Sequence, residues 1–276
     1  MQNSEEPVTI IDANRRWKRF ELSELLRYKD LFRFRVINQY KAQQRQTVLS
    51  YLWVFLDPAI NILFFTIVFG GLVKVDTNET PYVVFNTASM AGWLFLKNAM
   101  NFSVLSLNAE KILLQKIYFP RIMIPIIPVV VYLPNFLIQL ILSLVLIAFW
   151  GFYPGWELFY VVPQIFVMFL LSAGFGMLIS SFVVQFRDLE LIWRYFLQFA
   201  VYLIPVAYPI ESVHEAYQGI YTLNPMVYLI EGFRVAMIGG AYELKFFIYP
   251  LVFSLVLLFV GTLIYKSREP LIVDAL

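Results

Sequence analysis

The 276-residue chain contains no cysteine and a single histidine, His214. Without cysteine, a disulfide framework and thiolate metal sites are excluded, and one histidine is too few for a typical zinc site or a Ser-His triad. We therefore expect no metal site. Charged residues are also scarce, at 14% of the chain against 60% hydrophobic residues, which is unlike a soluble domain. The composition predicts an integral membrane protein.

The sequence also lacks the common nucleotide-binding and hydrolytic motifs. It has no GxxxxGK[ST] phosphate loop, no HExxH and no GxSxG, so neither ATP binding of the P-loop kind nor these hydrolytic chemistries are expected. Proton-driven carriers use chains of buried carboxylates, and only Asp57 is placed to be central to one. If the chain takes part in transport, its energy is expected to come from elsewhere.

Apolar runs of about 20 residues recur, each long enough to cross a hydrocarbon core of ~30 Å. If the N-terminus is cytoplasmic, 17 of the 21 lysines and arginines lie in segments on the inside, so the positive-inside rule places both termini in the cytoplasm. The expected fold is an all-α integral membrane domain, with residues 1–50 forming a cytoplasmic tail and an amphipathic helix, and residues 51–276 forming the transmembrane part. The six predicted spans are residues 51–73, 82–105, 124–149, 158–183, 192–209 and 246–266.

The N-terminal segment is basic and lacks the apolar core of a signal peptide, so we expect it to be retained. From Asp30 to Arg45 the pattern predicts an amphipathic helix with Asp30 as its N-cap. An interfacial helix lying in the membrane plane is the expected structure. Such a helix can also be a simple anchor on anionic headgroups. Its apolar face comprises Phe32, Val36, Ile37 and Tyr40.

A short charged segment, residues 108–121, separates the second and third predicted spans. It carries two lysines, one glutamate and one arginine beside apolar residues, and it stops at Pro120, which cannot donate a backbone hydrogen bond. The pattern predicts a compact amphipathic helix on the cytoplasmic side, and the alternative is an ordinary loop at the headgroups. In the span that follows, three prolines predict a kinked or irregular cytoplasmic half: Pro125, Pro128 and Pro134.

Residues 210–245 are too apolar for a free loop. Asn224-Pro225 predicts a turn, and Met226 to Met237 a second short helix closed by Gly239-Gly240. Two short helices joined in this way predict a re-entrant hairpin in the outer leaflet, which requires burial in protein or a water-filled cavity. The first helix would place on one face Val213, Ala216, Tyr217, Ile220 and Tyr221.

Aromatic residues make up 18% of the chain. Rings that pack on sugar faces, together with amides that bond sugar hydroxyls, would suit a glycan path. For any single aromatic, lipid contact or helix packing is the favoured explanation. Lys97, inside the second span, is expected to extend to the outer interface. The predicted path lining is Trp53, Asp57, Asn61, Trp93, Phe95, Gln198 and Tyr202.

Five blocks occur in a characteristic order: Tyr40–Trp53 with Pro58, Leu114–Pro125, Phe186-Arg187-Asp188, Pro205–Pro209, and Leu223–Met226 followed by Glu231–Arg234. Over nearly the whole chain this order resembles the ABC transporter permeases of the polysaccharide-export type, which move O-antigen, capsule or teichoic acid chains. The resemblance implies a homodimer in the bacterial plasma (inner) membrane, paired with two cytoplasmic ATPase subunits that hold ATP-Mg. No cofactor is expected on this chain itself.

The resemblance also implies roles for particular residues. The export path would follow the subunit interface, lined mainly by the first and fifth spans. Asp57 departs from the family, where an amide often precedes this proline, and its charge would tune which glycan passes if it faces the path. The implied ATPase-coupling residues are Asn108, Glu110, Lys111, Gln115, Lys116, Tyr118, Pro120, Arg121, Arg187 and Asp188. The implied periplasmic gate, in the 210–239 hairpin, contains Tyr217, Tyr221, Asn224, Pro225, Glu231 and Arg234.

The expected function is the membrane subunit, itself no enzyme, of an ATP-driven exporter of lipid-linked polysaccharide, with lipids but no nucleic acid as further partners. Two alternatives remain from the sequence. An exporter of a small hydrophobic drug or lipid shares the broad fold. An integral-membrane glycan polymerase or ligase would need a catalytic cluster in a sizeable outer loop, whereas the outer loops at 74–81 and 150–157 are short and the third is apolar.

Overall fold

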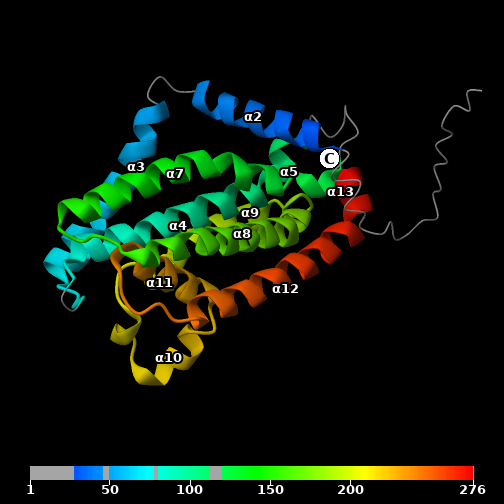
Figure 1. Ribbon diagram of the computed structural model, residues 1–276. Helices are drawn as coiled ribbons and strands as arrows, with labels where there is room; N and C mark the ends of the chain where they lie inside the picture. Colours follow the sequence, from blue (N-terminus) through cyan, green and yellow to red (C-terminus); the bar gives the residue numbers. More distant parts are fainter. Residues whose placement is uncertain (1–27, 46–49, 78–79, 112–119, 276) are drawn as a thin grey trace, which may run out of the picture.

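The computed structural model describes residues 28–45, 50–77, 80–111 and 120–275, and within these ranges it is helical without any strand (Figure 1). The N-terminal half contains α2 Lys29–Arg45, α3 Ser50–Phe65, a π-helix η1 Thr66–Leu72, α4 Tyr82–Val104, α5 Ser106–Ala109, η2 Arg121–Met123 and α7 Ile126–Phe149. The C-terminal half contains η3 Trp156–Tyr160, α8 Val161–Val183, α9 Asp188–Ala200, η4 Ile210–Ser212, α10 Glu215–Tyr221, α11 Pro225–Ile238, α12 Lys245–Ser267 and α13 Glu269–Ala275.

Within the described ranges, four helical segments are long and apolar enough to cross a membrane: Leu52–Leu72, Arg121–Phe149, Trp156–Val183 and Lys245–Ser267. They correspond to the first, third, fourth and sixth predicted spans. Helix α4, the predicted second span, has 23 residues but carries several polar side chains, among them Asn86 and Asn101, which keep it out of this set. The chain is thus a multi-pass helical membrane protein, and the count of six spans stays a prediction.

The predicted fifth span, residues 192–209, does not form one continuous helix. Helix α9 starts earlier, at Asp188, ends at Ala200, and has 13 residues, or about 20 Å at 1.5 Å per residue. The following residues form turns. Pro205 explains why the helix does not continue, because it lacks the N–H for a further helical hydrogen bond and disfavours helical backbone at Ile204. The correction shortens the span and leaves a buried irregular segment after it.

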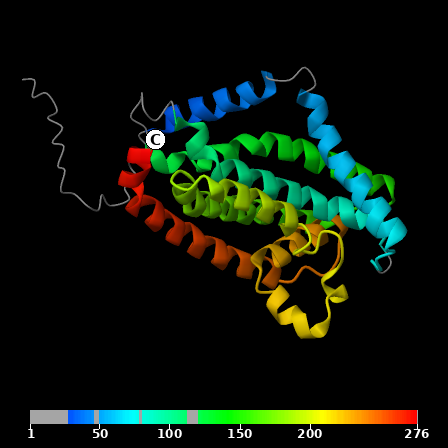
Figure 2. The same cartoon turned by 180° about the vertical axis from the view of Figure 1, so that it is seen from behind.

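Helices α4, α7, α8 and α12 run alongside one another as the main bundle (Figures 1 and 2). Helix α11 packs on α4, α8 and α12. Glycines allow α8 and α12 to approach closely, since a Cβ added to Gly261 of α12 would lie 2.9 Å from the carbonyl oxygen of Gly174 of α8. Close contact through small residues is the usual way in which helices pack within a membrane.

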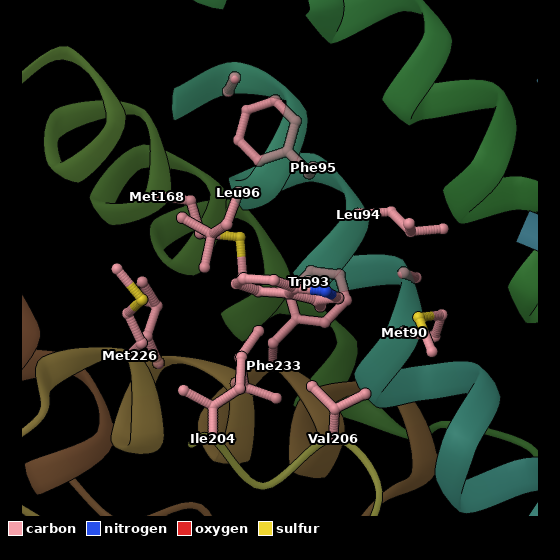
Figure 3. Packing of buried hydrophobic residues seen from close by; sticks show 14 of the residues in the cluster. Met90, Trp93, Leu94, Phe95, Leu96, Met168, Ile204, Val206, Met226 and Phe233 are labelled. Carbon is pink, nitrogen blue, oxygen red and sulfur yellow. The ribbon is translucent and has the colours of Figure 1, made fainter. Parts of the chain in front are cut away.

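The main core lies where α4 meets α8, α11 and the turns after α9 (Figure 3). Trp93 of α4 and Phe233 of α11 are almost fully buried there, beside the flexible side chain of Met168. Phe95 is fully buried as well, with its ring centroid 4.5 Å from that of Phe136 on α7. These contacts hold the four-helix bundle together around α4.

The N-terminal helix is confirmed, but its position differs from the prediction. Asp30 lies in the first turn rather than at the N-cap, because the Phe32 N–H already bonds the Tyr28 carbonyl. Instead of lying across the end of the bundle, α2 follows α7: Gln44 donates to Asn135 at 3.3 Å, about 14 Å along α7 from its start. Figures 1 and 2 both show α2 alongside α7.

A second apolar cluster explains the position of α2. The cluster joins α5, η2, the start of α7, and the ends of α8 and α12 to α13, and it includes Leu107, Tyr265 and Ile272. The face of α2 that carries Phe32, Val36 and Tyr40 packs against this cluster, whereas Ile37, predicted for the same face, is 40% exposed. Part of the apolar face of α2 is therefore covered by protein.

The irregular backbone predicted for the cytoplasmic half of the third span is present only at residues 121–125. A 3-10 turn, Arg121–Met123, precedes two further non-helical residues, and α7 then continues as one α-helix. Pro128 falls in the first turn of α7, where a missing N–H costs little, while Pro134 lies inside the helix.

Candidate functional site

The segments predicted to contact an ATPase meet at the end of the bundle that carries α5 and α13. Asn108, on α5, is exposed, as is Lys111, while Pro120 and Arg121 are partly exposed. Gln115, Lys116 and Tyr118 lie in residues 112–119, outside the described part of the chain. The predicted coupling helix is therefore described only at its two edges.

Two ion pairs fix those edges to neighbouring elements. Glu110 pairs with Arg35 of α2. Arg121 Nη1 lies 3.1 Å from Glu269 Oε1 of α13, and the Tyr265 hydroxyl donates to the Arg121 carbonyl at 2.9 Å. The sequence did not reveal these partners, because they stand 75 and 148 positions away in the chain. The two edges of the segment are thus joined to α2 and α13.

The second predicted contact, Arg187-Asp188, is exposed in the turn between α8 and α9. Arg268, next to α13, donates to Gln185 in this turn, and its guanidinium carbon lies 4.0 Å from the Phe182 ring centroid. The apolar cluster below contains Leu107 and Val184. Both predicted coupling segments therefore lie at the same end of the bundle, next to the same apolar cluster.

A hollow of about 210 Å³ opens between α3, α4 and α9. Four of the seven predicted path residues line it: Asn61, Trp93, Gln198 and Tyr202. The other lining residues are Phe64, Phe65, Met90, Lys97, Leu197 and Val201. The structure thus brings aromatic rings, two amides and one ammonium group from three helices to one place, a combination that can hold the faces and hydroxyls of a sugar.

The remaining predicted path residues lie elsewhere. Trp53 and Asp57 are exposed on α3, outside the lining of the hollow. Asn61 connects Asp57 to the hollow, because its Nδ2 donates to the Asp57 carbonyl at 2.7 Å and to Oδ1 at 3.2 Å. Phe95 needs a correction, because it is fully buried against Phe136 and does not line the hollow.

The predicted position of Lys97 also needs a correction. It stands 15 residues after the start of α4 at Tyr82, about 22 Å along the helix, and seven residues before its end. It is partly buried and lines the hollow instead of reaching the Tyr82 end, which is the outer one in the predicted orientation. Sequence position alone did not reveal this, since the hollow needs α3 and α9 on either side of α4.

The two short helices predicted on either side of Asn224-Pro225 are present as α10 and α11, whereas the re-entrant hairpin stays a prediction. The Asn224 Oδ1 accepts from the Met226 N–H at 3.0 Å, so Asn224 caps α11, and Gly239 ends it with φ 94°. Tyr217, on α10, is 66% exposed, whereas Tyr221 is partly buried with its ring 6.3 Å from that of Tyr208. A position of this hairpin in the outer leaflet stays a prediction.

Glu231 and Arg234 form the predicted i, i+3 pair, and both are nearly buried. Arg234 Nη1 also donates to the Pro205 carbonyl at 2.8 Å and to the Ser89 hydroxyl at 3.2 Å. Its guanidinium carbon lies 4.0 Å from the Phe85 ring centroid. One arginine therefore connects α11 to α4 and to the irregular segment after α9.

In the described part of the chain, no three histidine, aspartate or glutamate residues gather as a metal site would require. The expected absence of a metal stays a prediction.

Comparison with known proteins provides a separate line of information. Residues 31–238 match the family described as ABC-2 type transporter. The chain is 29% identical over 215 residues to the O-antigen export system permease protein RfbA of Myxococcus xanthus, a match that covers 76% of this chain and 81% of that protein. It is 23% identical over 251 residues to RfbA of Klebsiella pneumoniae, covering 91% and 93%. It is 22% identical over 225 residues to the polysialic acid transport protein KpsM of Escherichia coli, covering 80% and 86%.

Proposed function

The chain belongs to the ABC-2 type transporter family of membrane proteins, and on that premise we propose that it is the membrane-spanning subunit of an ATP-driven polysaccharide exporter. The observation that carries the proposal is the near full-length similarity to O-antigen export permeases, over 91% of this chain and 93% of a relative. The substrate class follows from those relatives, and we propose a lipid-linked glycan that moves from the cytoplasmic to the outer face of the inner membrane. This chain acts as a permease and not as a glycan polymerase or ligase.

The hollow between α3, α4 and α9 supports a sugar substrate over a purely apolar drug. Gln198 and Tyr202 add hydrogen-bonding groups to its aromatic wall, and amide or hydroxyl groups placed among rings fix the orientation of a polar ligand. Large apolar side chains on α3 and α9 flank the hollow and are exposed, such as Leu63, Phe196 and Phe199. We propose that a second copy of the chain covers them, so that the export path follows the dimer interface.

ATP hydrolysis would take place in two separate cytoplasmic ATPase subunits, which hold ATP-Mg and dock on the end that carries α5 and α13. The pairs Arg35–Glu110 and Arg121–Glu269 support this direction of coupling, since they connect the segment to α2 and α13. At the opposite end, the α10–α11 hairpin would serve as the gate. The buried Arg234 would carry movement of the α9 segment to α11.

The proposal is tested by deleting the gene and measuring polysaccharide on the cell surface and inside the cell. We expect the deletion to remove the surface polymer and to leave lipid-linked glycan inside the cell. The wild-type gene should restore export. Purification of the tagged chain in mild detergent should recover a cytoplasmic Walker-A ATPase in equal amount. Normal surface polysaccharide in the deletion strain, with no ATPase recovered, would refute the proposed function.

A further inference from the structure

Lys97 is a basic side chain in an unusual place. It lies on α4 and lines the hollow, with Met90 and Trp93 on the same helix face. Among the residues that the structure describes, none forms an ion pair or a hydrogen bond with it. Its position seven residues before Val104 places it about 10 Å from the end of α4, toward the predicted coupling end.

An ammonium group inside a membrane-spanning bundle is costly and is kept, as a rule, because it pairs with a ligand or lies on a transport path. Snorkelling explains such lysines near the ends of spans. Lys97 instead faces an open hollow, so an incoming group can reach it. A lysine without a partner at such a place indicates a site for an anion.

The other groups in the hollow favour an anion as well. None of the lining side chains is a carboxylate, and Gln198 contributes an amide that donates. Asn61, in contrast, turns its amide nitrogen toward Asp57. Asp57 itself lies outside the lining, so its charge does not occupy the place where Lys97 would hold a ligand.

We propose that Lys97 binds an anionic group of the exported glycan. The group is a phosphate of the linkage to the lipid or a carboxylate of an acidic sugar, because both present anionic oxygens that accept from an ammonium. Gln198 and Tyr202 donate to the same group or to a neighbouring hydroxyl, and the exposed rings of Phe64 and Tyr202 border the sugar. This inference rests on the proposed function, since it names what the exporter recognises in its substrate.

The test uses the full chain in nanodiscs of zwitterionic lipid and measures binding by titration calorimetry. Farnesyl diphosphate is compared with farnesol, and oligosialic acid with an uncharged maltooligosaccharide. We expect one anionic probe to bind at least about tenfold more tightly than its uncharged counterpart, since hydrogen bonds to charged groups are strong. The probe that binds identifies phosphate or carboxylate as the recognised group.

Three variants make the test specific. Lys97→Gln should lower the affinity for the anionic probe by about tenfold or more, to that for the uncharged probe. Lys97→Arg should retain most of the binding because it keeps the charge. Lys74→Gln removes an exposed positive charge outside the hollow and should bind as wild type does. Equal binding of the anionic probe by wild type and Lys97→Gln would overturn the inference, and so would a wild-type chain that binds neither anionic probe.

Export in cells separates this inference from the proposed function. If the wild-type gene restores surface polysaccharide while Lys97→Gln binds and exports like wild type, only the role of Lys97 is refuted. If the wild-type gene restores no export, the proposed function itself fails.

Discussion

At the scale of single residues, Arg234 connects more parts of this protein than its sequence context suggests. The neighbouring Glu231 is a local partner, three residues away on α11. The Ser89 hydroxyl and the Pro205 carbonyl come from α4 and from the turns after α9. Buried charges need partners for all their polar groups, so Arg234 holds these three elements in one arrangement.

Replacing Arg234 by alanine should therefore destabilise the protein strongly. The change leaves the Glu231 carboxylate buried beside an unfilled space, and loss of one partner of a buried pair costs about 3–5 kcal/mol. Thermal unfolding of the purified chain in detergent measures the effect. Arg194→Ala is the matched control, because its i, i+4 pair with Glu190 is more exposed and such pairs contribute about 0.5 kcal/mol. Similar melting temperatures for the two variants would contradict this role of Arg234.

At the scale of helices, the contact between α8 and α12 depends on two glycines. A Cβ at Gly174 would lie 3.1 Å from the Leu258 backbone nitrogen, and one at Gly261 would lie 2.9 Å from the Gly174 carbonyl oxygen. Backbone atoms cannot move aside as a side-chain end can. The absence of both Cβ atoms thus sets how closely the two helices approach.

We expect Gly261→Ala to push α12 away from α8 and to destabilise the protein by about 1–3 kcal/mol, as overpacking does. The measurement is again the unfolding temperature in detergent. Gly219→Ala serves as control, since a Cβ added in α10 meets no atom within 4 Å. That variant should be neutral or more stable by about 0.5–1 kcal/mol, because alanine is favoured over glycine in helices. Equal destabilisation by both changes would refute the close-packing argument.

At the scale of the whole molecule, two apolar clusters hold different sets of helices together. The large cluster around α4 unites the bundle with α11. The smaller one joins α2, α5 and α13 at the end where the predicted coupling segments lie. The hollow lies between α3 and α9 beside the large cluster. Under the proposed function, the end with the smaller cluster would contact the ATPase, and the substrate would pass beside the larger one.

The docking of an ATPase at that end is tested by reversing charge. Lys116→Glu combined with Arg121→Glu should reduce co-purification of the ATPase by about tenfold or more, since placing like charges across an interface costs several kcal/mol. Membrane insertion should not change. Arg121 also pairs with Glu269, so a third change, Glu269→Arg, restores that internal pair with opposite polarity. If the triple variant recovers the ATPase, the effect came from α13 and not from the interface.

The amino-acid sequence by itself determined the features that depend on local pattern. Four apolar runs, the cap at Asn224, the end of α11 at Gly239 and the Glu231–Arg234 pair all follow from residues close together in the chain. Composition and motif order also indicated the family, which residues 31–238 match. Such signals are readable because hydrophobic length, capping and i, i+3 spacing act within one helix.

Only the tertiary structure decided which helix faces meet. Phe95 lies in the core and Lys97 in the hollow, although they are two positions apart on α4. The position of α2 along α7 depends on a cluster built from six distant segments, and Arg121 finds Glu269 across 148 positions. An apolar stretch gains a similar free energy whether it packs against lipid or against protein, so the sequence does not show which of the two it contacts. Close packing of particular side chains decides between them.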